Sequence, residues 1–161
     1  DGEASLDDIE LGLREWQDTG CRLGLSFFLY LYADAAIFHK RLELADDLLG
    51  RAERFAEDSG EKFWSVGLRT LRGRLDLAHG KRDAGIAQFK DAARLAASLG
   101  HFGPLLNTIR ALVELDSSPD CTAELDEIVN TATNITDAHV PALTEAALLL
   151  NSQNTTVSNE S

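Results

Sequence analysis

The chain has 161 residues, of which 44% are hydrophobic and 26% charged, and these values favour one folded domain over wholesale disorder. Its formal net charge is −12, which excludes a generally basic surface, so we expect neither nucleic acid nor a membrane as a partner of this region. Only 3 prolines occur, and the frequent Leu, Ala and Glu residues favour helices.

A repeat with a period of 40 residues runs along the chain. Gly20, Gly60 and Gly100 are 40 residues apart, and each follows a helical pattern, where glycine adopts a positive φ at little cost. Each period also holds a set of small and apolar residues spaced i, i+4, i+7, which places them on one helix face. The sets are Ser5, Ile9 and Gly12; Ala45, Leu49 and Ala52; Gly85, Phe89 and Ala92; and Leu125, Val129 and Ala132.

Taken in chain order, these marks predict pairs of antiparallel helices. Residues 1–20 are the end of a preceding repeat, with a helix over 5–18. A first repeat over 21–60 has helices 22–39 and 42–58, and a second over 61–100 has helices 62–79 and 82–98. A degenerate third repeat over 101–137 has helices 103–115 and 121–135, and Asp120 is a candidate cap for the latter. A closing helix within 138–150 and a disordered tail over 151–161 follow.

A single helix pair cannot bury its apolar faces, but stacked pairs bury them against their neighbours. The sequence therefore predicts an all-α fold of the tetratricopeptide (TPR) type, a right-handed superhelix of antiparallel helix pairs. Ala33, Gly73 and Val113 stand 12 residues before the three later sets, where the first helix of each repeat crosses the second. Val113 is the largest of the three, in keeping with a degenerate third repeat.

Three stretches of sequence resemble a known family. They are TGCRLGLSFFL at 19–29, SGEKFW at 59–64 followed by LRG at 71–73, and the helix over 83–99. Together they resemble the C-terminal TPR region of large bacterial adenylate and guanylate cyclases and of related signalling ATPases and transcription regulators. Ser26 stands where that family usually has proline. The resemblance covers about residues 9–101 and implies a regulatory region that senses a ligand or partner.

The chain offers little that points to catalysis. It contains no phosphate-binding loop, no dinucleotide fingerprint and no zinc-protease or serine-hydrolase motif. The histidines are scattered, and His39 and His79 fall at predicted helix ends, where the helix dipole favours a cation. The two cysteines have no metal-ligand spacing, so we expect reduced thiols. We therefore expect no enzyme, no metal and no cofactor in this region.

The candidate binding residues come from the first helices, which line the concave face of such a superhelix. Offsets of six before, three before and one after the small residue resemble the groove positions of the family. They select Phe27, Tyr30, Asp34, Gly67, Thr70, Arg74, Asn107, Arg110 and Glu114. Phe27 and Tyr30 fit either the groove or the core, whereas the core is expected for Phe28, Leu31 and Tyr32. An ordinary solvated surface is the competing interpretation of the whole set.

The sequence thus predicts an interaction module of a larger bacterial signalling protein. The chain lacks an initiator methionine and a signal peptide, and its most apolar stretch, 23–38, is shorter than a membrane span, so we expect a cytoplasmic piece of that protein. Its partner would be a protein, a peptide or a small effector, and its output would be cyclic-nucleotide synthesis. The alternatives are a module for self-association as a homodimer and the effector-binding region of a transcription regulator.

Overall fold

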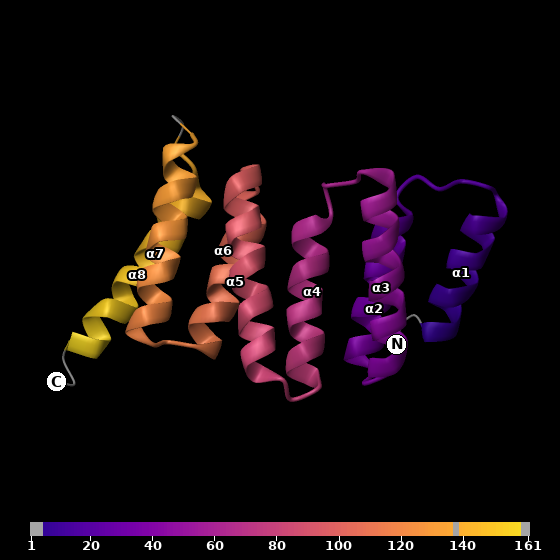
Figure 1. Ribbon diagram of the computed structural model, residues 1–161, viewed down its shortest axis with the longest axis horizontal. Coiled ribbons are helices and arrows are strands. Elements are labelled where there is room, and N and C mark those ends of the chain that lie inside the picture. The colour runs from indigo at the N-terminus through magenta and orange to yellow at the C-terminus, as the bar shows by residue number, and fades with distance from the viewer. Residues whose placement is uncertain (1–4, 137–138, 159–161) are drawn as a thin grey trace. The chain divides into compact units, whose positions relative to one another are not determined.

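The computed structural model describes residues 5–136 and 139–158, with side chains through residue 153, and all its regular elements are helices (Figure 1). The all-α prediction is confirmed in these ranges. The helices are α1 (Leu6–Asp18), α2 (Leu25–Phe38), α3 (Leu42–Ser59), α4 (Ser65–Ala78), α5 (Arg82–Leu99), α6 (Phe102–Leu115), α7 (Pro119–Asn134) and α8 (Pro141–Ser158).

Two of the first helices begin later than the sequence predicts. We expected helices from residues 22 and 62, whereas α2 begins at Leu25 and α4 at Ser65. A hydrogen-bonded turn precedes each helix, because the Leu25 amide donates to the Arg22 carbonyl and the Ser65 amide to the Lys62 carbonyl, both at 3.2 Å. The same turn in both places is consistent with the 40-residue period.

The start of α7 corrects a predicted cap. Ser118, not Asp120, is the N-cap, and its hydroxyl accepts a hydrogen bond from the Cys121 amide at 3.2 Å. Pro119 follows as the first helical residue, where its fixed φ suits a helix and its missing N–H is not needed. Asp120 therefore lies in the first turn of the helix.

The predicted helix ends at Gly20, Gly60 and Gly100 are confirmed, with φ values of 75°, 69° and 68°. A second series ends the first helices, at Lys40 with φ 58° and Gly80 with φ 76°. In both places the next amide reaches back into the last turn, Arg41 to the Ala36 carbonyl at 2.8 Å and Lys81 to the Asp76 carbonyl at 2.9 Å. This is the hydrogen bond of a Schellman cap, which normally carries glycine at the left-handed position.

The repeat positions on α3, α5 and α7 form the core, as their spacing predicts. On α1 the prediction is wrong, because Ser5 and Gly12 are exposed and Leu13 is the buried residue. Ala45, Leu49 and Ala52 are fully buried, and so are their counterparts on α5 and α7. Gly85 shows why a small residue is required, since an added Cβ would lie 2.8 Å from the Leu77 side chain and 3.0 Å from the Gly73 carbonyl oxygen. Gly12, at the same repeat position on α1, has no neighbour within 4 Å.

The core prediction for Leu31 is wrong, because this side chain is 43% exposed. Leu29 and Tyr32 mark the buried side of α2, at 2% and 4% exposure. At about 100° per residue, Leu31 points roughly 200° away from Leu29 and so leaves the core. Tyr32 is buried as predicted, and Phe28 is half-buried.

The chain divides into two compact units, residues 1–85 and 86–161. In the first, α2 and α3 form an antiparallel pair, α1 packs on α2, and α4 packs on both members of the pair (Figure 1). In the second, α8 packs on α6 and α7, which also contact each other. None of the described helices is long and apolar enough to cross a membrane.

The end of α8 differs from the predicted tail. We expected the closing helix to stop at residue 150, whereas α8 continues through Ser158. The added residues are Asn, Ser, Gln, Thr and Val, which form helices only moderately well. Extending an existing helix requires much less free energy than starting one, so these residues continue the helix that precedes them. The remainder of the predicted tail, 159–161, lies outside the described residues.

Candidate interaction face

Six of the sequence-selected residues come from two helices of the first unit. Phe27, Tyr30 and Asp34 lie on α2, and Gly67, Thr70 and Arg74 lie on α4. On each helix the three positions are spaced i, i+3, i+7, which places them on one side. The two helices pack against each other. We refer to these six residues together as the α2–α4 face.

The Tyr30 ring connects the two helices through Gly67. A Cβ placed on Gly67 would lie 3.5 Å from Cε2 of Tyr30, so the ring faces Gly67 and leaves room there for no more than a methyl group. Tyr30 is half-buried as a result. The sequence allowed Tyr30 to lie either in the groove or in the core. Its ring packs between the two helices, but part of the ring surface remains accessible to a ligand.

Asp34 and Arg74 form an ion pair between α2 and α4. Their side chains remain 37% and 45% exposed, so both charged groups are accessible to solvent. A pair with this exposure contributes only about 0–1 kcal/mol to stability, because water and salt screen it. Little free energy is therefore needed to separate the two groups, and each is available to a bound molecule.

The charges of this pair act on Tyr30. Burial raises the pKa of the Tyr30 hydroxyl above 10.0, the Asp34 carboxylate raises it further, and Arg74 lowers it. The phenol is therefore neutral at physiological pH, with an O–H that donates a hydrogen bond. The α2–α4 face thus combines an apolar ring, a neutral donor, an anion and a cation.

An aromatic cluster adjoins this face. The Phe27 and Trp64 rings stack with centroids 4.3 Å apart and planes inclined by 22°. Phe63 meets Trp64 edge-on at 4.8 Å and is itself 67% exposed. Sequence reasoning did not select Trp64, because it lies in the turn before α4, outside the helical offsets that were counted. Its place within the SGEKFW segment was the available signal.

Thr70 offers a ligand fewer hydrogen bonds than its position on the face predicts. Its hydroxyl donates to the Val66 carbonyl of its own helix at 2.9 Å, so the proton is already used. The oxygen keeps a lone pair and can only accept from a ligand. Thr70 is half-buried and widens the face without adding a free donor.

The other three selected residues lie on α6 in the second unit, and we describe them separately. Asn107, Arg110 and Glu114 are all exposed. Arg110 forms an ion pair with Glu145 of α8, and the two side chains are 47% and 55% exposed. No aromatic residue was selected on this helix, and Arg110 is paired with α8 rather than with Glu114. This set has the character of a solvated helix surface.

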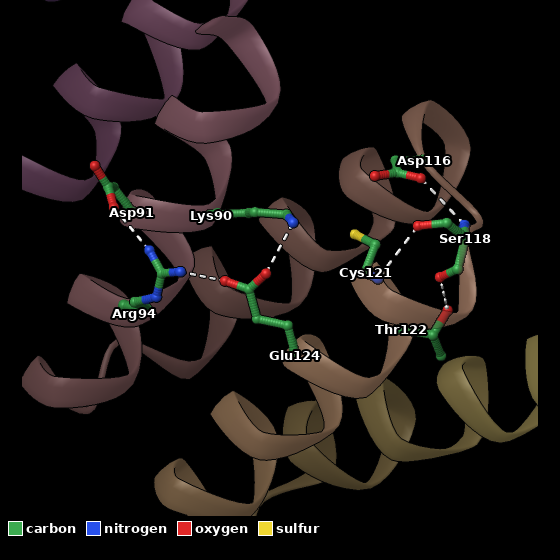
Figure 2. Close-up of polar contacts among 8 residues, drawn as sticks. All are labelled: Lys90, Asp91, Arg94, Asp116, Ser118, Cys121, Thr122 and Glu124. Atoms are coloured by element: carbon green, nitrogen blue, oxygen red, sulfur yellow. Dashed lines mark hydrogen bonds and ion pairs between the residues drawn. The ribbon is translucent and has the colours of Figure 1, made fainter. Parts of the chain in front are cut away.

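A second polar cluster lies where α7 meets the later part of α5 (Figure 2). Glu124 binds Lys90 at 2.8 Å and also pairs with Arg94, which in turn contacts Asp91 at 2.8 Å. Nearby, Cys121 is only 1% exposed, and burial raises the pKa of its thiol. A buried, protonated thiol is a poor nucleophile, so this cluster holds helices together rather than forming a reactive site.

The histidines do not converge. His39 and His79 are the C-caps of α2 and α4, the helix ends that their sequence position predicted. His101 is the N-cap of α6, and His139 is exposed. Within the described ranges, no group of three or more His, Cys, Asp or Glu residues has a geometry that would hold a metal ion.

Comparisons with protein-family models, with curated proteins and with solved structures found no similar protein. The resemblance of residues 9–101 to the repeat region of bacterial cyclases therefore remains a prediction.

Proposed function

We propose that this chain is a TPR-like interaction module that binds a peptide segment of a partner protein on its α2–α4 face. The observation that carries the proposal is the combination of the half-buried Tyr30 ring, which faces Gly67, with an accessible Asp34–Arg74 ion pair beside it. Aromatic side chains provide contact area, and the exposed charges and the Tyr30 hydroxyl orient polar groups of the peptide.

The 40-residue period adds support. Phe27 and Gly67, Tyr30 and Thr70, and Asp34 and Arg74 are pairs of equivalent positions in successive repeats. Stacked repeats present equivalent positions side by side, which suits an extended peptide that runs from one repeat to the next. The partner is a segment with an apolar side chain for the Phe27–Trp64 stack and a charged group for Asp34 or Arg74.

The larger context follows from the sequence resemblance. We propose that the module belongs to a multidomain bacterial signalling protein in which a cyclase makes cyclic nucleotide, and that partner binding here regulates that output. A transcription regulator carrying the same type of module is the alternative parent. The two differ in the output domain, so the domain that accompanies this region in the full-length protein distinguishes them.

The binding proposal is tested with a displayed library of random peptides selected on the wild-type protein. Selected peptides should lose about tenfold or more in affinity when Arg74→Ala or Asp34→Ala removes one charge of the face, since a charge-assisted hydrogen bond is lost. Arg54→Ala on α3 is the control, because Arg54 is exposed and lies on a different helix. The proposal would be refuted if the affinity of the selected peptides were unchanged in both Arg74→Ala and Asp34→Ala.

Self-association is a second candidate, favoured by exposed apolar side chains. Leu11 on α1 is 56% exposed and Leu23, just before α2, is 81% exposed. Apolar surface of this kind can pair two copies of a chain. Light scattering coupled to size exclusion tests it directly. A mass near 17.5 kDa would exclude a stable dimer, and a doubled mass that Leu11→Glu restores to 17.5 kDa would establish one.

A further inference from the structure

A cavity of about 320 Å³ lies between α1 and α3, away from the α2–α4 face. Tyr32 of α2 lines it, and Tyr32 is two residues from Tyr30, so the two side chains leave α2 about 200° apart. The volume is at the lower end of the range that small-molecule sites occupy. The cavity therefore suits a small ligand rather than a peptide.

The walls of the cavity have an apolar part. Leu6 and Leu13 come from α1, and Leu44 and Leu48 come from α3. Leu13 and Leu48 are 7% and 1% exposed, so the deeper wall belongs to the core. An apolar group placed here would lose contact with water at little cost to the protein.

The remaining wall carries both positive and negative charges. Its guanidinium groups are those of Arg14, Arg41 and Arg51, and its carboxylates are those of Asp7 and Glu10. Asp47, just outside the lining, lies 3.6 Å from Arg51 and brings the acidic groups at this wall to three, so the wall is locally neutral although the whole chain carries −12. Binding of a charged ligand therefore depends on which of these groups has no partner of its own.

The existing partners of these groups identify which arginine is available. Arg14 pairs with Glu10, and Arg51 lies 3.6 Å from Asp47. Glu10 also accepts the Tyr32 hydroxyl at 3.4 Å. Arg41 has no ion-pair partner among the residues that the structure describes, and it is exposed. A guanidinium in this situation can take a carboxylate with two parallel hydrogen bonds.

The next repeat shows how such a space is filled from within the protein. Arg72 is 40 residues after Tyr32, and it binds Glu53 through two hydrogen bonds of 3.2 and 2.6 Å and also binds Asp46. The counterparts of Asp46 and Glu53 are Leu6 and Leu13. The cavity therefore lies where leucines and tyrosine replace an ion network.

We propose that this cavity binds a small amphipathic carboxylate, with its apolar body against Leu6, Leu13 and Leu48 and its carboxylate on Arg41. The apolar wall, the Arg41 guanidinium without an ion-pair partner among the described residues and the small volume together define that class of ligand. The site is separate from the peptide site proposed above and does not depend on it.

Octanoate is a suitable probe, and isothermal titration calorimetry on the 161-residue chain measures its binding. We expect saturable binding that weakens about tenfold or more with Arg41→Ala, because one charge-assisted interaction is lost. Leu44→Trp, which places a larger side chain in the cavity, should weaken binding as well. Lys81→Ala is the matched control, since Lys81 is the exposed counterpart of Arg41 in the next repeat and should leave binding unchanged.

Three comparisons decide the outcome. Octylamine, which has the same apolar body and a positive charge, should not bind. The proposal is overturned if octanoate does not saturate, if Arg41→Ala and Leu44→Trp both leave its affinity unchanged, or if octyl sulfate binds at least tenfold more tightly. If the protein does not bind octanoate but forms a dimer that Leu44→Trp dissociates, the cavity serves self-association instead. Thermal melting of each variant confirms that it folds.

Discussion

Asp34 and Arg74 occupy equivalent positions in successive repeats, 40 residues apart, and form an ion pair that joins α2 to α4. Two residues earlier on α4, Arg72 forms a different network with Asp46 and Glu53 of α3. The side chain of Arg72 is 21% exposed and that of Arg74 is 45% exposed. One helix thus presents two arginines that both pair with a neighbouring helix, and the Arg74 guanidinium is the more exposed of the two.

This contrast predicts different effects on stability. Arg72→Ala should lower the free energy of unfolding by about 1–2 kcal/mol, because the hydrogen bonds of one half-buried guanidinium to Glu53 and Asp46 are lost. Arg74→Ala should lower it by no more than about 1 kcal/mol. Urea unfolding followed by tryptophan fluorescence measures both, since Trp16 and Trp64 lie in the first compact unit. Equal losses for the two variants would contradict this difference.

Lys40 is the site of a stabilising substitution. It has a φ of 58°, in the left-handed region, where its counterpart Gly80 has 76°. A residue with a Cβ is strained there by about 1–2 kcal/mol. Glycine relieves this strain, but its larger backbone entropy in the unfolded state cancels part of the gain in stability. Lys40→Gly should therefore raise the urea midpoint by the equivalent of about 0.5–1 kcal/mol. Gly80→Lys is the reverse change and should lower it; an unchanged midpoint in both variants would argue against the strain.

The pKa of Tyr30 reports the charges of the α2–α4 face. Burial and Asp34 raise this pKa above 10.0, whereas Arg74 lowers it. Asp34→Asn should therefore lower the pKa of Tyr30, and Arg74→Ala should raise it. Tyrosinate absorbance during an alkaline titration measures the shift, in a Tyr32→Phe background that leaves one tyrosine.

The same pKa fixes a pH dependence of stability. Because the folded pKa is higher than the unfolded one, the folded state holds the Tyr30 proton more tightly. This contribution is fully present below about pH 10, the unfolded value, and is lost as the pH rises through the folded pKa. A Tyr30→Phe variant should lose less stability above pH 10 than the wild type does. Parallel alkaline curves for the two proteins would exclude this contribution.

The two cysteines should react at different rates. Cys121 is 1% exposed, and burial raises the pKa of its thiol, so little thiolate is present and reagents cannot reach it. Cys21 is partly exposed. A thiol reagent should therefore modify one group in the native protein and the second only in denaturant. Fast native labelling of Cys121 in a Cys21→Ser variant would show that α7 opens readily.

Much of the fold follows from the sequence because its signals are local and periodic. Gly20, Gly60 and Gly100 end helices where only glycine is unstrained, and the i, i+4, i+7 sets of α3, α5 and α7 mark the buried faces, whereas the set of α1 does not. Leu31 was misjudged because α2 is apolar on all sides, and such a helix carries no pattern that identifies its solvent side. The helical end of α8 was missed because propensity alone does not set where a helix stops.

The contacts of the site were less accessible from sequence. The i, i+3, i+7 offsets select Tyr30, Asp34 and Arg74. They do not reveal that Asp34 pairs with Arg74, because this contact depends on how α2 and α4 approach each other. The partner of Ser26 is likewise a tertiary contact: its buried hydroxyl donates to the Glu61 carboxylate. The cavity beside Tyr32 depends on the separation of α1 and α3, which no local pattern encodes.

Amide chemical-shift mapping with a selected peptide tests the central proposal most directly. Binding at the α2–α4 face predicts the largest shifts at Phe27, Tyr30, Asp34, Gly67, Thr70 and Arg74. The same titration of an Arg74→Ala protein should require about tenfold more peptide to reach half-saturation. Shifts confined to α7 and α8, or a half-saturation point unaffected by Arg74→Ala, would contradict it and place the binding surface elsewhere on the chain.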